Sequence, residues 1–502
     1  MSNPDFDVLI VGAGLSGIGA AYHLQEKCPG KSYAILEGRD AIGGTWDIFR
    51  YPGIRSDSDM HTLGYNFKPW EERKAIADGP SILKYVRDTA VENGIDKRIR
   101  YNHLVRKVSW DSPSATWTVE SEDAKTGATH TLTCRFLYMC SGYYSYEGGY
   151  KPDFPGEDSF KGTIVHPQKW PEDLDYKDKK VVVIGSGATA VTLVPEMAKD
   201  AAHVTMLQRS PTYVVSRPAE DAMANRLRSF LPSKLAYGLT RWRNVLFQMF
   251  FYNLARKKPE KTKDRIIGMA KAELGPDFDV DTHFTPAYNP WDQRLCLVPD
   301  SDLFLSLKEG SSSVVTDHIE TFTETGIKLK SGETLDADII VSATGLQLVF
   351  LGGVDVVVDG EAVKASDIHG YRGVMFETIP NLASTFGYTN ASWTLKADLT
   401  ADFVTRLLKY MDRQRFVEVR PVAEGEIGEE PWLDFSSGYV TRVMDQFPKQ
   451  GRELPWKLHQ NYVKDIFLLR HANLNDGVLK FRAVDEAPET GQGESQEVVA
   501  AE

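Results

Sequence analysis

The chain has 502 residues, of which 42% are hydrophobic and 25% are charged, and its net charge at pH 7 is -12. This length exceeds what one ordinary hydrophobic core accommodates, so at least two domains are expected. The acidic balance argues against a nucleic-acid partner, because phosphate binding needs a basic face.

The cysteines and the N-terminal sequence indicate which chemistry and which cellular compartment to expect. The four cysteines are scattered and form no C-x-x-C pair, so we expect no metal site and no redox disulfide. The start, MSNPDFDVLIVGAG, enters a strand pattern within a few residues and lacks the basic start of a signal peptide, which makes the cytoplasm the expected compartment.

The first strong motif follows an apolar strand over residues 5–11. Gly12, Gly14 and Gly17 form G-x-G-x-x-G at the start of a helix pattern, which is the setting that a dinucleotide pyrophosphate requires. A second strand ends in Glu37, at the distance where a carboxylate accepts hydrogen bonds from a ribose. Because a carboxylate would repel a 2′-phosphate, FAD or NAD suits this site better than NADP.

A long loop with two glycines and a Y-P-G turn covers residues 43–57. Long ordered loops are usually functional, and this one contains Gly44, Thr45, Trp46 and, at its end, Asp57. The alternative for Asp57 is a structural Asx-turn. Downstream, residues 80–100 indicate a helix, and residues 117–142 indicate a β-hairpin leading to a buried strand.

Between two nucleotide-binding patterns lies a segment, residues 160–171, that belongs to neither. Its pattern F-x-G-x-x-x-H-x-x-x-W comes from Phe160, Gly162, His166 and Trp170, and it ends in a proline that a helix interior excludes. We interpret it as a linker. In the alternative interpretation, His166 and Trp170 only pack.

The second nucleotide pattern is a G-x-G-x-x-A turn formed by Gly185, Gly187 and Ala190 after another apolar strand. The next strand ends with Arg209 and Ser210 where the first unit has its acid. An arginine beside a hydroxyl matches a ribose 2′-phosphate, so the second unit is predicted to bind NADPH.

Residues 218–281 are basic, aromatic and helical in pattern, and they interrupt the second unit. The stretch 241–258 combines apolar residues with flanking arginines and lysines. Two interpretations stay open: a helix in weak contact with a membrane surface, or a helix packed on the domain near the substrate entrance. After the insertion, Arg294 precedes an apolar strand and would place a rigid cation at the domain junction.

The predicted fold class is α/β, with two Rossmann-like dinucleotide-binding domains, for FAD and NADP, and a helical insertion in the NADP domain. A strand over 335–345 is expected to return the chain to the first domain. The predicted segments are an FAD domain in two parts, 1–145 and 346–482, an NADP domain in two parts, 146–217 and 282–345, the insertion 218–281, and a disordered acidic tail, 483–502.

Taken together, these motifs resemble the class B Baeyer–Villiger flavin monooxygenases over nearly the whole chain. The resemblance implies that segment 160–171 joins the FAD and NADP domains and that the loop ending at Asp57 covers the flavin. It also implies that Arg294 and Asp57 are catalytic, with Asp57 orienting Arg294 and tuning its charge. Many relatives have a lysine before that arginine, which contacts the coenzyme phosphate, whereas this chain has Gln293. NADPH preference therefore depends more strongly on Arg209.

With no cysteine pair beside the flavin, O2 is the expected electron acceptor. The resemblance implies an oxygen insertion through a C4a-peroxyflavin that converts a small-molecule ketone to an ester or lactone, with oxidation of thioethers as a side reaction. One alternative is a monooxygenase that oxygenates nitrogen or sulfur atoms. The other is a sensor that binds NADPH and flavin without turnover.

Overall fold

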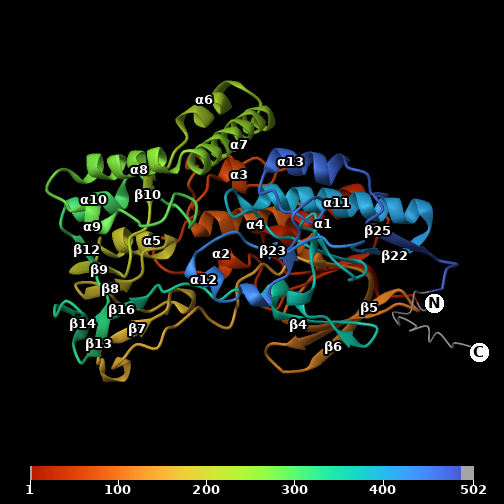
Figure 1. Cartoon of the computed structure of the whole chain (residues 1–502), viewed down its shortest axis with the longest axis horizontal. Helices are drawn as coiled ribbons and strands as arrows, with labels where there is room; N and C mark the ends of the chain where they lie inside the picture. The colour runs from red at the N-terminus through yellow and green to blue at the C-terminus, as the bar shows by residue number, and fades with distance from the viewer. Residues whose placement is uncertain (1–2, 488–502) are drawn as a thin grey trace, which may run out of the picture.

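The computed structural model describes residues 3–487, which form two lobes (Figure 1). The beginning and the end of the chain, red to orange and blue, build one lobe, and the yellow and green middle builds the other. Each lobe contains a sheet with adjacent parallel strands and flanking helices. The predicted α/β fold with two Rossmann-like units is confirmed.

The sheet of the first lobe has nine strands within the described residues, in the order β18-β17-β4-β5-β6-β1-β2-β3, with β21 paired to β6. Strand β6 pairs antiparallel with β5 in its first half and parallel with β1 and β21 at its end. The predicted hairpin thus leads the chain to the edge where β1 ends. The strands are Phe6–Val11 (β1), Tyr33–Leu36 (β2), Ile99–Arg100 (β3), His103–Asp111 (β4), Thr116–Asp123 (β5), Thr129–Met139 (β6), Asp355–Val358 (β17), Glu361–Ala362 (β18) and Leu382–Ser384 (β21).

The sheet of the second lobe is parallel throughout and, over residues 3–487, has five strands in the order β12-β9-β8-β16-β7. Its central strands are buried on both faces, as their continuous apolar runs predict. These strands are Thr163–Val165 (β7), Lys180–Ile184 (β8), His203–Gln208 (β9), Ser312–Thr316 (β12) and Ile339–Ser342 (β16).

Shorter strands complete both lobes. An antiparallel sheet contains Ile319–Thr323 (β13), Gly326–Leu329 (β14) and Thr334–Asp336 (β15). The two-stranded pairs are Val214–Arg217 (β10) with Cys296–Pro299 (β11), Gly370–Tyr371 (β19) with Met375–Phe376 (β20), Phe416–Pro421 (β22) with Leu479–Ala483 (β25), and Glu430–Pro431 (β23) with Lys449–Gln450 (β24).

The α-helices include a group in the predicted insertion, where α6 to α9 lie one after another. None of the helices in residues 3–487 combines the length and hydropathy that crossing a membrane requires. The helices are Leu15–Lys27 (α1), Thr45–Ile48 (α2), Met60–Leu63 (α3), Gly79–Glu92 (α4), Ala188–Met197 (α5), Ala222–Phe230 (α6), Ser233–Lys257 (α7), Pro259–Leu274 (α8), Val280–His283 (α9), Asp302–Lys308 (α10), Trp393–Gln414 (α11), Gly438–Thr441 (α12) and Tyr462–Ile466 (α13).

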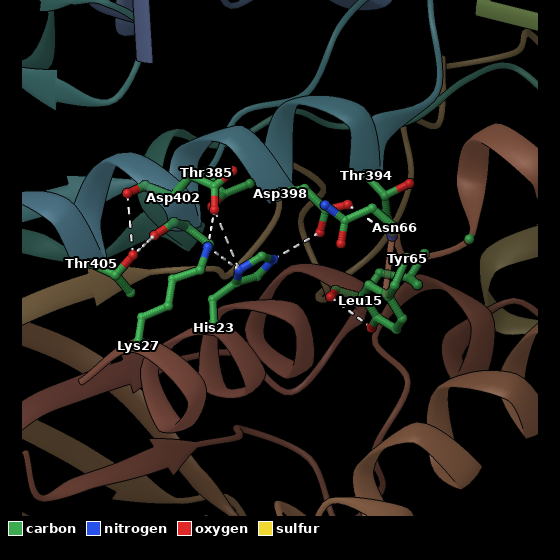
Figure 2. Close-up of polar contacts among 12 residues, drawn as sticks. Leu15, His23, Lys27, Tyr65, Asn66, Thr385, Thr394, Asp398, Asp402 and Thr405 are labelled. Atoms are coloured by element: carbon green, nitrogen blue, oxygen red, sulfur yellow. Dashed lines mark hydrogen bonds and ion pairs between the residues drawn. The ribbon is translucent and has the colours of Figure 1, made fainter. Parts of the chain in front are cut away.

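Helices α1 and α11 are joined by buried charges (Figure 2). His23 Nε2 on α1 lies 3.3 Å from Asp398 Oδ1 on α11, and Lys27 contacts both His23 and Asp402. The other oxygen of Asp398 accepts a hydrogen bond from Arg241 of α7 at 3.4 Å. Because buried charges are costly unless they are paired, this cluster fixes the helix that begins at the first glycine motif.

The two passages of the chain between the lobes, residues 143–150 and 345–349, run side by side. The Ser145 amide donates to the Gln347 carbonyl at 2.8 Å, and similar backbone hydrogen bonds flank it on either side. The lobes are thus connected by one paired strap.

Local expectations differ from the structure at two places. The single strand expected over 335–345 is divided between β15 and β16, which belong to different sheets; between them, the Asp338 carboxylate accepts the Lys180 amide at 2.8 Å. The segment 160–171 contributes β7 as an edge strand of the second sheet, in addition to connecting. Strand β25 ends at Ala483, and 488–502 of the predicted tail lie outside the described residues.

Candidate active site

The first glycine turn is held by contacts that leave no room for a side chain. Gly12 has φ 103°, and a methyl group on it would lie 2.5 Å from the Cys140 carbonyl oxygen at the end of β6. A methyl group on Gly17 would lie 1.9 Å from the Gly12 carbonyl oxygen, so α1 packs directly on the turn. A methyl group on Gly14, by contrast, would make only ordinary contacts of 3.7 to 3.9 Å with the backbone of Gly43 and Gly44. The turn therefore exposes backbone at Gly14 for a ligand's close approach.

Glu37 lies at the end of β2, as predicted, and is buried. Its carboxylate accepts the Ala13 amide at 2.8 Å and the Arg39 amide at 3.0 Å. Burial raises the pKa of Glu37, and the two backbone donors oppose that shift only in part. The carboxylate is fixed beside the first glycine turn.

The second glycine turn has the same backbone arrangement as the first. Gly185 has φ 140°, and a methyl group on it would lie 2.5 Å from the Ala343 carbonyl oxygen at the end of β16. A methyl group on Gly187 would meet nothing within 4 Å, which is the space a pyrophosphate needs at the N-terminus of α5. Arg209 and Ser210 follow β9 and are exposed beside this turn.

The loop 43–57 connects the two nucleotide units. At its start, Gly44 lies against Gly14, and α2, with Thr45 and Trp46, follows directly. Farther along, Phe49 and Tyr51 are buried in the hydrophobic core of the second lobe. The loop thus contacts the first glycine turn and the core of the second lobe before it reaches Asp57.

Arg294 and Asp57, which are 237 residues apart in sequence, form an ion pair. Nη1 of Arg294 lies 2.8 Å from Oδ2 of Asp57, and Nη2 donates to the Tyr143 hydroxyl at 3.4 Å. The side chains are 34% and 41% exposed, so the pair is accessible to a ligand. Two residues after Arg294, the Cys296 thiol lies 3.9 Å from the Ser186 carbonyl oxygen in the second glycine turn. The arginine lies between the two units.

The electrostatics keep Arg294 charged. Burial disfavours the guanidinium and lowers its pKa, but the neighbouring acidic groups of Tyr439, Tyr143 and Asp57 outweigh burial and hold the pKa well above its ordinary value. Burial in turn raises the pKa of Tyr439 to about 12, although Arg294 opposes this shift, so that tyrosine stays neutral. The site presents a permanent, oriented cation.

A row of aromatic side chains, which the sequence alone did not indicate, connects Arg294 to the first glycine turn. Tyr143 stacks on Trp393 with ring centroids 5.1 Å apart, and the Trp393 indole donates to the Ser16 hydroxyl at 2.7 Å. The signal available was the SGYYSY sequence directly after β6. A small apolar void of about 10 Å³, room for about one water molecule, adjoins these side chains and is lined by Tyr143 and by Phe350, Phe386, Trp432 and Phe447.

The linker segment, residues 160–171, packs against the strap between the lobes. Gln168 Nε2 donates to the Ser145 carbonyl at 2.6 Å, and His166 Nδ1 accepts the Gln168 amide at 3.2 Å. The His166 ring lies so close to Gly149 that a methyl group there would be 2.0 Å from Cε1. Burial lowers the pKa of His166, so the imidazole is neutral near pH 7. Phe160 and Trp170 pack in two different hydrophobic clusters of the second lobe.

Solved structures of two monooxygenases share this fold. A steroid monooxygenase bound to NADP superposes with a TM-score of 0.70 at 24% identity, over 83% of this chain and 87% of that one. A cyclohexanone monooxygenase from Rhodococcus sp. Phi1, bound to NADP+, gives a TM-score of 0.71 at 20% identity, over 85% and 88%. At these identities the likeness shows the fold alone.

Sequence comparison identifies the family as well as the fold. Residues 64–269 match the family described as flavin-binding monooxygenase-like, and residues 10–73 match an NAD(P)-binding Rossmann-like domain. The chain is 54% identical to FAD-containing monooxygenase EthA of Mycobacterium tuberculosis over 477 residues, 95% of this chain and 97% of the relative. It is 51% identical to probable FAD-binding monooxygenase AlmA of Acinetobacter baylyi over 478 residues, 95% and 96%. Two nucleotide turns with an arginine between them, and this degree of identity along the chain, make it a member of the FAD-containing monooxygenases, with FAD and NAD(P) as its cofactors.

Proposed function

We propose that this monooxygenase inserts one oxygen atom of O2 beside the carbonyl of an apolar ketone, giving an ester or lactone. The observation that carries the proposal is the ion pair of Arg294 and Asp57 at the junction of the two nucleotide units. When bound, FAD reduced by NADPH supplies the activation of O2. The residues that would hold the flavin are the turn Gly12 to Gly17, Glu37 and the loop that begins at Gly44.

The role of Arg294 follows from its charge and position. Attack on a carbonyl carbon moves negative charge to the carbonyl oxygen, and a preoriented cation stabilises that charge most where water is partly excluded. Asp57 and the Tyr143 hydroxyl hold the guanidinium from two sides, which limits its rotation. Asp57 therefore acts as a positioning residue for Arg294.

The aromatic residues around Tyr143 support an apolar substrate, which could enter only if these rings move apart, because the void between them has room for about one water molecule. Its walls are mainly the aromatic rings of Phe350, Phe386, Trp432 and Phe447. Such a lining favours a ketone or thioether with hydrocarbon substituents and gives few hydrogen bonds to a polar one.

The reaction class is tested with the purified FAD-loaded enzyme. It is reduced anaerobically with NADPH, mixed with O2, and then offered phenylacetone, with products identified by mass. We expect the ester. Oxygenation of an amine or thioether with no ester from any ketone tried would contradict the proposal and favour the heteroatom alternative, and the absence of oxygenated product would favour the sensor.

Arg209 and Ser210 are proposed to hold the coenzyme 2′-phosphate, because they are exposed beside a turn with room for the pyrophosphate. For Arg209→Gln, we expect KM for NADPH to rise by about 10-fold or more, the cost of one charge-assisted contact. KM for NADH and kcat should change little. An equal rise in KM for NADPH and for NADH would contradict a contact to the 2′-phosphate.

The variant Gln293→Lys should tighten NADPH binding.

His166 is proposed to position the strap between the lobes. For His166→Ala, we expect slower flavin reduction by NADPH, by about 10-fold, as for other residues that govern domain movements. FAD content should stay at the wild-type level. The measurement is the anaerobic stopped-flow rate, with Lys169→Ala as the control on the same segment. A wild-type rate in His166→Ala would leave the ring a packing role only.

A further inference from the structure

Helix α7 exposes an apolar face along its length. Leu235, Leu239, Trp242, Leu246 and Phe250 follow one another at three- and four-residue intervals, which places them on one side of the helix. All five are solvent-exposed, from 46% for Trp242 to 65% for Phe250. A helix packed on a domain normally turns such a face inward, so this one calls for an explanation.

The apolar face continues beyond α7. Helix α6 adds Met223 and Phe230, which are 56% and 64% exposed. The ring centroid of Trp242 lies 5.9 Å from that of Tyr462 on α13, and Phe467, which follows α13 in the chain, is 64% exposed. Figure 1 shows α6 and α7 at the outer edge of the molecule, with α13 beside them. We call this surface the α7 face.

Cations flank the α7 face although the protein as a whole is acidic. Between Asp221 and Glu260 the sequence has no acidic residue. Its basic residues are Arg226, Arg228, Lys234, Arg241, Arg243, Arg256, Lys257 and Lys258. Of these, Arg226, Lys234, Lys257 and Lys258 are exposed and form no ion pair within residues 3–487. The local charge is opposite in sign to the net charge of -12.

The inner side of α7 contacts both loops that form the catalytic pair. Asn244 and Gln248 donate to the Asp59 carboxylate at 3.0 and 3.1 Å, two residues from Asp57. At the other end, Arg256 pairs with Asp292 at 2.8 Å, two residues before Arg294. Any surface that covers the α7 face therefore lies just outside the site.

We propose that the α7 face binds the surface of a bilayer containing anionic lipid. Apolar side chains on one face of a helix, with lysines and arginines around them, match the boundary between headgroups and acyl chains. Each exposed cation near an anionic surface adds attraction. A second copy of the chain is a poorer occupant, because two α7 faces in contact would bring their cations together. The inference does not depend on which atom the enzyme oxygenates.

Vesicle sedimentation of the full-length FAD-loaded enzyme tests this proposal. We expect binding to phosphatidylcholine vesicles that contain about 30% phosphatidylglycerol, weaker binding without it, and release by salt. The variant Leu239→Ser/Leu246→Ser/Phe250→Ser should bind at least about 10-fold less, and Lys257→Glu/Lys258→Glu should lose the preference for anionic lipid. Val91→Ser, which removes a 63% exposed apolar residue from α4, is the matched control.

Each variant must retain FAD and the wild-type circular dichroism spectrum. If the triple variant fails this requirement, Phe250→Ser alone replaces it. Wild-type enzyme that stays unbound at low salt would overturn the proposal. So would concentration-dependent dimerisation, measured by sedimentation velocity, that disappears in the variants while vesicle binding is absent, because the occupant would then be a second copy.

Discussion

The variant Arg294→Ala is expected to lower kcat for ester formation by about 10²–10³-fold, about 3–4 kcal/mol of transition-state stabilisation. The reason is that no other cation within residues 3–487 contacts Asp57 or Tyr143 and could take its place. FAD content should be unchanged, because Arg294 does not contact the first glycine turn. The measurement is ester yield per NADPH consumed at saturating ketone.

Two further variants distinguish the positive charge of Arg294 from the geometry of its guanidinium. Arg294→Lys keeps the charge but cannot reach Asp57 and Tyr143 with two separate nitrogens, so an intermediate rate is expected. Arg55→Ala, which removes a guanidinium paired with Asp302 in the neighbouring loop, should retain ester formation. Wild-type ester formation by Arg294→Ala would mean that the proposed role of the cation is wrong.

For Gly17→Ala we expect loss of bound FAD together with a destabilisation of about 3 kcal/mol, the scale of an overpacked buried position. The added methyl group would lie 1.9 Å from the Gly12 carbonyl oxygen, and backbone cannot move aside as a flexible side chain can. Flavin absorbance after gel filtration and the thermal unfolding midpoint measure the two effects.

Gly187→Ala is the matched control, because it changes a glycine of the other nucleotide turn where the methyl group would meet nothing within 4 Å. Its φ of -80° is ordinary for any residue. This variant should fold, keep its FAD and bind only the nicotinamide coenzyme less well. Full FAD occupancy in Gly17→Ala would contradict the close packing of α1 on the turn.

The parts of this protein that were predictable are those specified by local sequence. The strands before Gly12 and Gly185 and the acid at Glu37 have fixed spacings, so the motif itself implies the turn and the strand that follows. Strand β7, in contrast, has three residues, which is too short for any periodicity, and the glycine and prolines of the surrounding segment 160–171 indicated a linker.

The side-chain contacts of the site were less accessible from the sequence. The stacking of Tyr143 on Trp393 joins positions 250 residues apart, and no local pattern selects one aromatic partner among many. The pairing of Arg294 with Asp57 was expected only through the family resemblance. The exposed face of α7 was visible as composition, but whether it points outward depends on tertiary packing.

The strap formed by residues 143–150 and 345–349 limits how the lobes can move. Two separate connections at distant points would lock the lobes, and a single one would let them swivel in any direction. Two chain segments hydrogen-bonded to each other act as one connection, so the strap by itself opposes rotation about its own line less than other relative motions of the lobes. Since Tyr143 belongs to the strap and contacts Arg294, the cation lies near the rotation axis, where the same angle moves it least. For a given rotation about this line, the coenzyme sites farther from it would move more than Arg294 does.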